Sequence, residues 1–249
     1  MRHPHVVDLL REGALDPGLA ALLWLLVEDR VPLVVTGPAP ADQRRAFARA
    51  VLSLDPDLDW VVLDAEGGAL STERLAALLR GEAAFGVDVE AHDLKELLER
   101  LETAGLPRDG VRRLGVVAVL DQSDAGLRCT SVHYLRPSER DGQGHVQRRP
   151  PAVLAAWDPE TDAFEDYAWG ITPELATRVD RAQADLEERQ LSRARFLAAA
   201  TTDAEKSGIG ERVRAHLASE PPRVPVPERE AARPSPFAGG LLDPDSHRH

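Results

Sequence analysis

Most of the candidate functional residues lie in one short junction, Thr36 to Arg45, which reads TGPAPADQRR. The apolar run Val31 to Val35 precedes it and predicts a buried strand, and helical spacing of apolar residues follows it. A turn between a strand and a helix is a common place for phosphate, because the first backbone N–H groups of the helix and its dipole favour an anion. The junction therefore has the outline of a nucleotide-binding loop.

The side chains of this junction do not fit phosphate chemistry. A phosphate-binding P-loop reads G-x-x-x-x-G-K-[ST]: the second glycine lets backbone N–H groups close around phosphates, the lysine reaches the β/γ oxygens, and the hydroxyl holds magnesium. Counted from Gly37, those three places hold Asp42, Gln43 and Arg44. No shift of register restores the motif, because the first lysine of the chain is Lys95. We therefore expect no catalytic residue in this loop.

The remaining candidate residues each have a structural and a functional interpretation. Asp64 ends a second apolar run and is either a turn residue before Gly67 or the remnant of an acid beside a metal. His92 follows a third apolar run and is either a strand-end histidine or part of a binding site. Cys129 lies in an alternating segment, where a small buried side chain is expected rather than a nucleophile. The arginines that open the helix after the loop, Arg44 among them, are interpreted as a solvated face. No metal site is predicted.

Composition limits the possible partners and compartments. The net charge of −12 and pI near 5.1 argue against nucleic acid or an anionic membrane as the main partner, since both reward clustered positive charge. The apolar stretch Leu19 to Val27 is far shorter than the roughly 20 residues that cross a bilayer. One cysteine excludes an internal disulfide, and no leading basic and apolar segment suggests export. We expect a cytoplasmic protein that is not inserted in a membrane.

The elements that must position the junction alternate between helix and strand. We expect helices over about 6–11, 17–29, 43–54, 71–84 and 93–103, and strands over about 32–36, 60–64, 87–91 and 116–120. Alternation of this kind predicts an α/β domain over residues 1–126, with a parallel sheet flanked by helices.

The pattern changes after residue 126. Residues 127–135 alternate, 136–149 resemble a hairpin loop, and 151–157 and 164–167 predict two more strands, which together form an antiparallel β addition. Thr172-Pro173-Glu174 opens a long helix that continues toward Thr201, and a second helix ends near Ser219. The Pro/Arg/Glu-rich residues 220–249 are expected to be disordered. Two arrangements of the β region at 127–168 stay open: part of the main sheet, or a separate small domain.

The order of these pieces resembles the type II/type IV secretion (pilus assembly) ATPases. The helix Asp16 to Glu28, with the apolar strand and Thr36-Gly37-Pro38 after it, is similar to the entry of that family's motor domain. The segment Phe85 to Asp93 resembles the family's His box, and Leu97 to Glu102 is like the "RLE" helix that follows the box. The resemblance covers about Asp16 to Leu120.

The resemblance implies a RecA-type α/β motor that forms hexameric rings and drives secretion or pilus machinery with magnesium-ATP. Carried over residue by residue, the vestigial nucleotide site comprises Gly37 at the start of the loop, Gln43 at the lysine position, Arg44 at the hydroxyl position, Asp64 in the acidic box and His92 in the His box. The family also needs a strand with a Walker B acid before its His box. We see only a turn and one helix there, so a truncated RecA-like sheet is expected.

Three functions follow as hypotheses. The favoured one is a degenerate, inactive relative of the secretion ATPases that acts as a scaffold or regulatory subunit, with an intact secretion ATPase or a second copy of itself as protein partner. The alternatives are a weakly active ATPase and a module that senses nucleotide without turnover. No cofactor is expected in the first case, and ATP with magnesium is expected only where the nucleotide site is retained.

Overall fold

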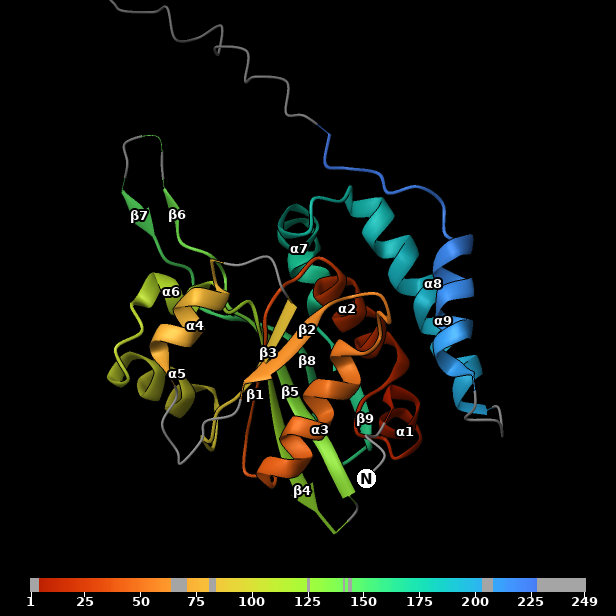
Figure 1. Ribbon diagram of the computed structural model, residues 1–249, viewed down its shortest axis with the longest axis horizontal. Coiled ribbons are helices and arrows are strands. Elements are labelled where there is room, and N and C mark those ends of the chain that lie inside the picture. The colour runs from red at the N-terminus through yellow and green to blue at the C-terminus, as the bar shows by residue number, and fades with distance from the viewer. Residues whose placement is uncertain are drawn as a thin grey trace, which may run out of the picture.

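The computed structural model describes residues 5–63, 71–80, 84–124, 126–140, 142, 145–202 and 208–227 (Figure 1). Its helices are α1 (Val6–Arg11), α2 (Pro17–Glu28), α3 (Ala41–Leu52), α4 (Thr72–Leu78), α5 (Leu94–Thr103), α6 (Arg108–Arg112), η2 (Ala168–Ile171), α7 (Thr172–Arg178), α8 (Gln183–Thr202) and α9 (Ile209–Ser219). Its strands are β1 (Leu33–Thr36), β2 (Trp60–Leu63), β3 (Ala84–Asp88), β4 (Val116–Ser123), β5 (Gly126–Tyr134), β6 (Glu139–Arg140), β7 (Val146–Gln147), β8 (Ala152–Asp158) and β9 (Ala163–Asp166).

One mixed sheet runs through the molecule. Its seven strands lie in the order β2-β3-β1-β4-β5-β8-β9, and β6 and β7 form a separate ribbon. The first four strands are parallel, and β5, β8 and β9 continue the sheet in antiparallel fashion. The predicted α/β fold with flanking helices is confirmed. Of the strands in the 127–168 region, β5, β8 and β9 belong to the main sheet, while β6 and β7 pair only with each other among the described residues. The domain boundaries stay a prediction.

Helices cover the two faces of the sheet unequally. The larger core joins α1, α2, α3 and α8 to one face. A smaller core joins α5 and α6 to the other face, over the parallel strands (Figure 1). Asp16 caps α2 by accepting from the Leu19 N–H at 2.6 Å, and Pro17 holds its first position. Because α2 is apolar on all sides, it lies buried between the sheet and α8.

Two predicted elements have different limits in the structure. The strand expected at 87–91 is β3, Ala84–Asp88, because Gly86 to Asp88 pair with Leu33 to Val35 of β1. The single long helix expected from Thr172 is divided into α7 and α8 by Asp180, whose φ of 46° is left-handed. The break lets the buried Arg181 reach Asp29 at 3.4 Å and Asp185 at 3.1 Å. The apolar stripe alone did not predict this ion pairing.

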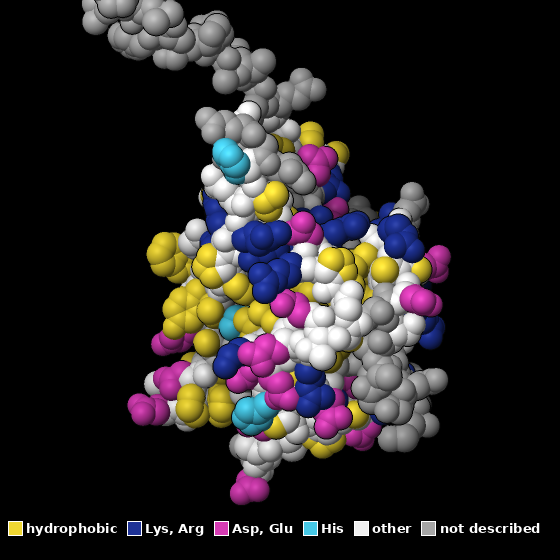
Figure 2. Space-filling view, turned by 90° about the vertical axis from the view of Figure 1, so that its left-hand side faces the viewer, with side chains coloured by type: hydrophobic (Ala, Val, Ile, Leu, Met, Phe, Trp, Pro, Cys, Tyr) yellow, Lys and Arg dark blue, Asp and Glu magenta, His cyan; other side chains and the backbone are white. Residues whose placement is uncertain are grey.

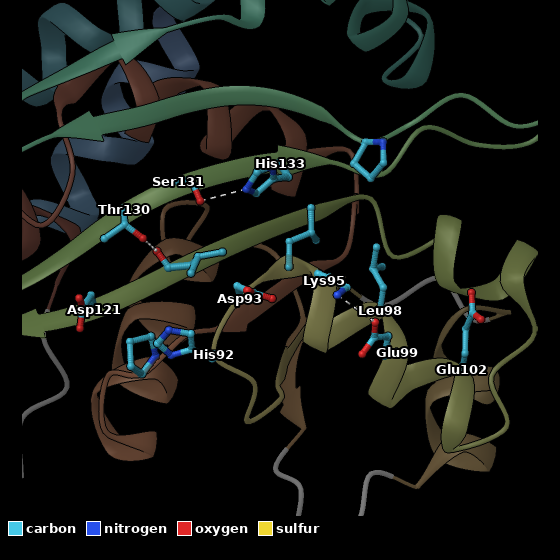
Figure 3. A pocket seen from close by; sticks show the side chains of 14 residues that line it. His92, Asp93, Lys95, Leu98, Glu99, Glu102, Asp121, Thr130, Ser131 and His133 are labelled. Carbon is cyan, nitrogen blue, oxygen red and sulfur yellow. Dashed lines mark hydrogen bonds and ion pairs between the residues drawn. The ribbon is translucent and has the colours of Figure 1, made fainter.

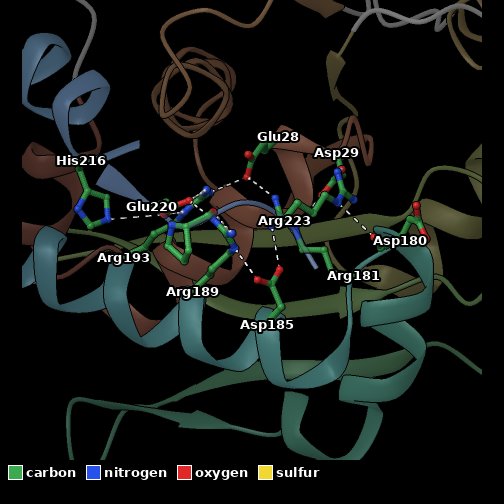
Figure 4. Close-up of polar contacts among 11 residues, drawn as sticks. Glu28, Asp29, Asp180, Arg181, Asp185, Arg189, Arg193, His216, Glu220 and Arg223 are labelled. Atoms are coloured by element: carbon green, nitrogen blue, oxygen red, sulfur yellow. Dashed lines mark hydrogen bonds and ion pairs between the residues drawn. The ribbon is translucent and has the colours of Figure 1, made fainter. Parts of the chain in front are cut away.

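The expectation of disorder from residue 220 is wrong for the first residues of that segment. Glu220 accepts from Arg189 at 2.6 Å and from Arg193 at 2.8 Å, and Arg223 pairs with Asp29 at 2.7 Å (Figure 4). The backbone N–H of Ala182 donates to Val224 at 2.7 Å. Buried arginines on α8 hold the segment, since each needs a carboxylate partner. Residues 228–249 lie outside the described part of the chain.

Candidate functional site

The turn after β1 is built by packing against β4. Gly37 has a φ of +113°, a conformation that glycine adopts without strain. A Cβ at this position would lie 2.1 Å from the Leu120 carbonyl oxygen, so no other residue fits. The β-bulge between Val119 and Leu120 lies at the same place. The glycine that the resemblance placed at the start of a vestigial nucleotide loop therefore allows the turn after β1 to lie against β4.

The backbone N–H groups of this turn do not point into a cradle. Gly37 donates to the Ala91 carbonyl at 2.8 Å, and Ala39 donates to the Leu120 carbonyl at 3.1 Å. Pro38 and Pro40 have no N–H to offer. A phosphate-binding loop works by directing several such donors at the anion. From Gly37 to Pro40, each backbone donor is either absent or bound to a carbonyl of Ala91, after β3, or of Leu120 in β4.

Arg44 fills the inside of the loop. Its guanidinium donates to the Ala39 carbonyl at 2.6 Å, to the Gly37 carbonyl at 3.1 Å and to the Asp88 carboxylate at 2.6 Å. The side chain is 5% exposed, so its interpretation as part of a solvated face is wrong. The loop presents carbonyl oxygens around a cation, which is the opposite polarity to a phosphate cradle.

Asp88 is the site residue that the sequence analysis missed. It ends β3, the parallel neighbour of β1, and its side chain is 5% exposed. Arg45 adds a second contact to its carboxylate at 3.6 Å. A lone aspartate within the apolar run Phe85 to Val89 was the available signal, because a carboxylate is rarely buried unless it is paired.

A cavity of about 510 Å³ opens beside this ion pair, between the start of α3 and α5. Its cations are paired with neighbouring carboxylates: Arg44 and Arg45 with Asp88, and Arg100 with Glu96 at 2.7 Å. An anion entering here would have to compete with those carboxylates. The cavity therefore offers no ready phosphate site.

The other predicted site residues that the structure describes are Gln43 and His92. Gln43 donates its backbone N–H to the Pro40 carbonyl at 3.0 Å, within the first turn of α3. Asp64 lies outside the described residues. His92 is exposed on a second cavity, which Pro38 also lines, and its backbone N–H donates to Glu96 at 2.8 Å. His92 lies beside the loop, because the residue before it, Ala91, accepts from the Gly37 N–H at 2.8 Å.

The cavity beside His92 is a groove of about 740 Å³ between α5 and the strands β4 and β5 (Figure 3). His133 and Ser131 lie on its β5 side, with 2.9 Å between the His133 Nε2 and the Ser131 Oγ. Burial lowers the pKa of His133, so its ring is neutral at neutral pH.

Cys129 is buried as predicted, and burial raises the pKa of its thiol, which disfavours the thiolate.

The sequence matches no protein-family model, and no significant match is found among curated proteins. None of the helices in the described part of the chain is long and apolar enough to cross a membrane. No group of three or more metal-ligating side chains lies together among the described residues. The geometry around Arg44 and the groove beside His92 are therefore the features from which we infer a function.

Proposed function

We propose that this chain is a catalytically inactive relative of the secretion and pilus motor ATPases that acts as a scaffold or regulatory subunit. Its α/β core would contribute surfaces to an assembly instead of turning over nucleotide. An intact secretion ATPase or a second copy of this chain is the partner we expect. On this proposal the sheet is a truncated RecA-like sheet, and the protein works in the cytoplasm.

The Arg44 guanidinium inside the loop is the observation that carries the proposal. Its contacts with two loop carbonyls and with Asp88 occupy the space that a phosphate would need. Catalysis of phosphoryl transfer depends on positioned donors and metal ions that stabilise the transferred charge. On this proposal, the N–H groups of Gly37 and Ala39 donate to neighbouring carbonyls, and the Arg44–Asp88 ion pair lies where the charge of a substrate would be.

The same geometry weighs against the two alternatives. A weakly active ATPase and a nucleotide sensor both require a phosphate site. To make one, Arg44 would have to leave Asp88, and the buried carboxylate would lose its closest partner at 2.6 Å. Breaking a buried ion pair in this way costs about 3–5 kcal/mol, which nucleotide binding would have to supply.

The test measures phosphate release from magnesium-ATP by the purified full-length chain, together with its complex formation. We expect no release above a preparation of an Asp88→Asn variant purified in the same way, and co-elution with an intact secretion ATPase of the same organism in size-exclusion chromatography. Magnesium-dependent turnover that the variant lacks would overturn the inactive assignment. Separate elution of the two proteins, combined with a monomeric chain, would overturn the scaffold assignment.

A further inference from the structure

A small hollow between α5 and α6 brings an apolar wall together with several arginines. Its volume is about 180 Å³. It is lined by the apolar residues Leu98, Val111, Leu135 and Pro151 and by the charged residues Glu102, Arg108, Arg112 and Arg148. These residues define the arginine hollow. Figure 2 shows Lys and Arg side chains gathered near the centre of the face that carries α6 and the β6–β7 ribbon.

Arg112 is a fixed cation in the arginine hollow. Its Nη1 donates to the Arg149 carbonyl at 2.7 Å and to the Arg136 carbonyl at 3.0 Å. Since Arg136 precedes the β6–β7 ribbon and Arg149 follows it, the guanidinium ties α6 to both strands at the base of the ribbon. None of the ion pairs between described residues includes Arg112. Its charge is therefore held in place without a carboxylate partner.

The neighbouring charges do not cancel the charge of Arg112. Arg148 pairs with Asp109 at 3.5 Å. Glu102, the carboxylate in the lining, pairs with Arg108 at 3.3 Å. Burial first, and then the charge of Arg148, lowers the pKa of Arg112, while Asp109 has the smallest effect and raises it. An anion beside Arg112 and Arg148 would relieve the repulsion between them.

The lining selects a ligand that is both acidic and apolar. A guanidinium can donate two parallel N–H groups to the oxygens of one carboxylate, which makes this pairing strong and directional. A bare inorganic anion would leave the apolar wall uncovered. The hollow is also smaller than the roughly 300–1,000 Å³ of most small-molecule sites. A peptide can place one apolar side chain in such a hollow and a carboxylate beside it, and arginine clusters are a known means of recognising acidic motifs.

We propose that the arginine hollow is the docking site for an extended acidic segment of a partner protein, with an apolar side chain against Leu98 and Pro151 and with Asp or Glu beside it on Arg112 and Arg148. The inference rests on the proposed function in one respect only, that this chain works by binding another protein. The net charge of −12 repels an acidic segment at long range, so the attraction must come from these short-range contacts.

The test uses the full-length protein and a rhodamine-labelled peptide, Gly-Gly-Leu-Asp-Leu-Asp-Gly-Gly, in fluorescence anisotropy. We expect saturable binding. A peptide with Asn in place of both Asp residues should bind at least tenfold more weakly, and so should a peptide with Ser in place of both Leu residues. Equal binding of the Asp and Asn peptides would overturn the proposal, because the arginines would then not recognise the carboxylates.

A charge reversal in the protein locates the site. Arg148→Glu should weaken binding tenfold or more. Its matched control is Arg195→Glu, which makes the same charge change at an exposed position of α8 and should leave the affinity within twofold of wild type. A peptide with Lys in place of both Asp residues should bind Arg148→Glu at least tenfold more tightly than it binds Arg195→Glu, a gain that a misfolded variant would not show. Equal losses in the two variants, or no gain with the Lys peptide, would overturn the proposal.

One truncation separates a partner from the chain itself. Residues 228–249 include the apolar and acidic run Leu241 to Asp245. Ending the chain at Pro227 should leave peptide affinity within twofold of wild type. A gain of tenfold or more would overturn the partner assignment, because it would mean that this run competes for the hollow. These outcomes are independent of nucleotide: peptide binding that fails in a chain without ATP turnover removes the docking site alone, and ATP turnover removes the proposed function alone.

Discussion

At the scale of single residues, Arg44 decides the chemistry of the loop. The sequence shows that Arg44 stands at the position of a hydroxyl residue, but it does not show where the side chain points. A guanidinium within reach of two carbonyls and a carboxylate satisfies its donors internally. The strand, the turn and the helix surround a guanidinium with carbonyl oxygens, whereas a phosphate-binding loop would direct N–H groups inward.

Replacing Arg44 should therefore destabilise the fold. Arg44→Ala removes the 2.6 Å contact to the buried Asp88 carboxylate. We expect the free energy of unfolding to fall by about 3–5 kcal/mol, as for other broken buried pairs. Urea denaturation followed by circular dichroism measures this. Arg49→Ala on the same helix is the control and should change stability by less than about 0.5 kcal/mol; equal losses in the two variants would mean that the buried pair does not hold the loop.

Gly37 offers a second test at this scale. Gly37→Ala places a Cβ against the Leu120 backbone and at a φ that alanine rarely adopts, so we expect a loss of at least about 2 kcal/mol in the free energy of unfolding. Gly210→Ala is the matched control, because a Cβ there meets nothing within 4 Å and the residue lies inside α9. That variant should be neutral or more stable by up to about 1 kcal/mol. Similar thermal denaturation of both variants would contradict the packing role of Gly37.

At the scale of elements, local signals predicted some boundaries well and others poorly. Asp16-Pro17 placed the start of α2 correctly, because capping is decided by neighbouring residues. The limits of β3 and the break at Asp180 were missed. The first depend on pairing with β1, and the second accompanies ion pairs of Arg181, between α7 and α8, with Glu28 and Asp29 at the end of α2. The groove beside His92 could not be predicted from the sequence either. It arises from the position of α5 relative to β5, and those elements are brought together only by the sheet order.

The docked segment after α9 gives a prediction about truncation. Ending the chain at Ser219 removes Glu220 and leaves Arg189 and Arg193 without that carboxylate. We expect a loss of about 3 kcal/mol or more, which for a protein of this size lowers Tm by roughly 2–4 °C per kcal/mol. Ending the chain at Pro227 should leave Tm within about 1 °C of the full-length value, because the contacts described for this segment are retained. Scanning calorimetry of both truncations decides the matter, and equal Tm values would show that the segment contributes nothing.

Glu220 should also make stability depend on pH. Burial opposes its ionisation, but hydrogen bonds and charge from Arg193 and Arg189 outweigh burial and hold its pKa below the ordinary 4.5. Because the folded pKa is the lower one, the stabilisation is present above about pH 4.5 and is lost as the pH falls through the folded value. Urea denaturation from pH 3 to 6 should show a steeper loss in the wild type than in Glu220→Gln. Parallel curves would contradict this role.

At the scale of the whole molecule, one continuous sheet supports two unlike regions. The parallel strands carry the loop that surrounds Arg44. The antiparallel strands border the groove beside α5. The alternation of helices and strands predicted the α/β class. The continuation of the sheet through β5, β8 and β9 was left open, because pairing between distant strands has no local signal.

Calorimetric titration of the full-length chain with magnesium-ATP measures whether the loop around Arg44 binds nucleotide. A ligand that binds only the folded state must raise Tm, so thermal denaturation at millimolar magnesium-ATP provides the second readout. We expect no saturable heat and a Tm within about 1 °C of the nucleotide-free protein. Saturable binding that raises Tm and is abolished in an Asp88→Asn variant would mean that the loop is a working nucleotide site.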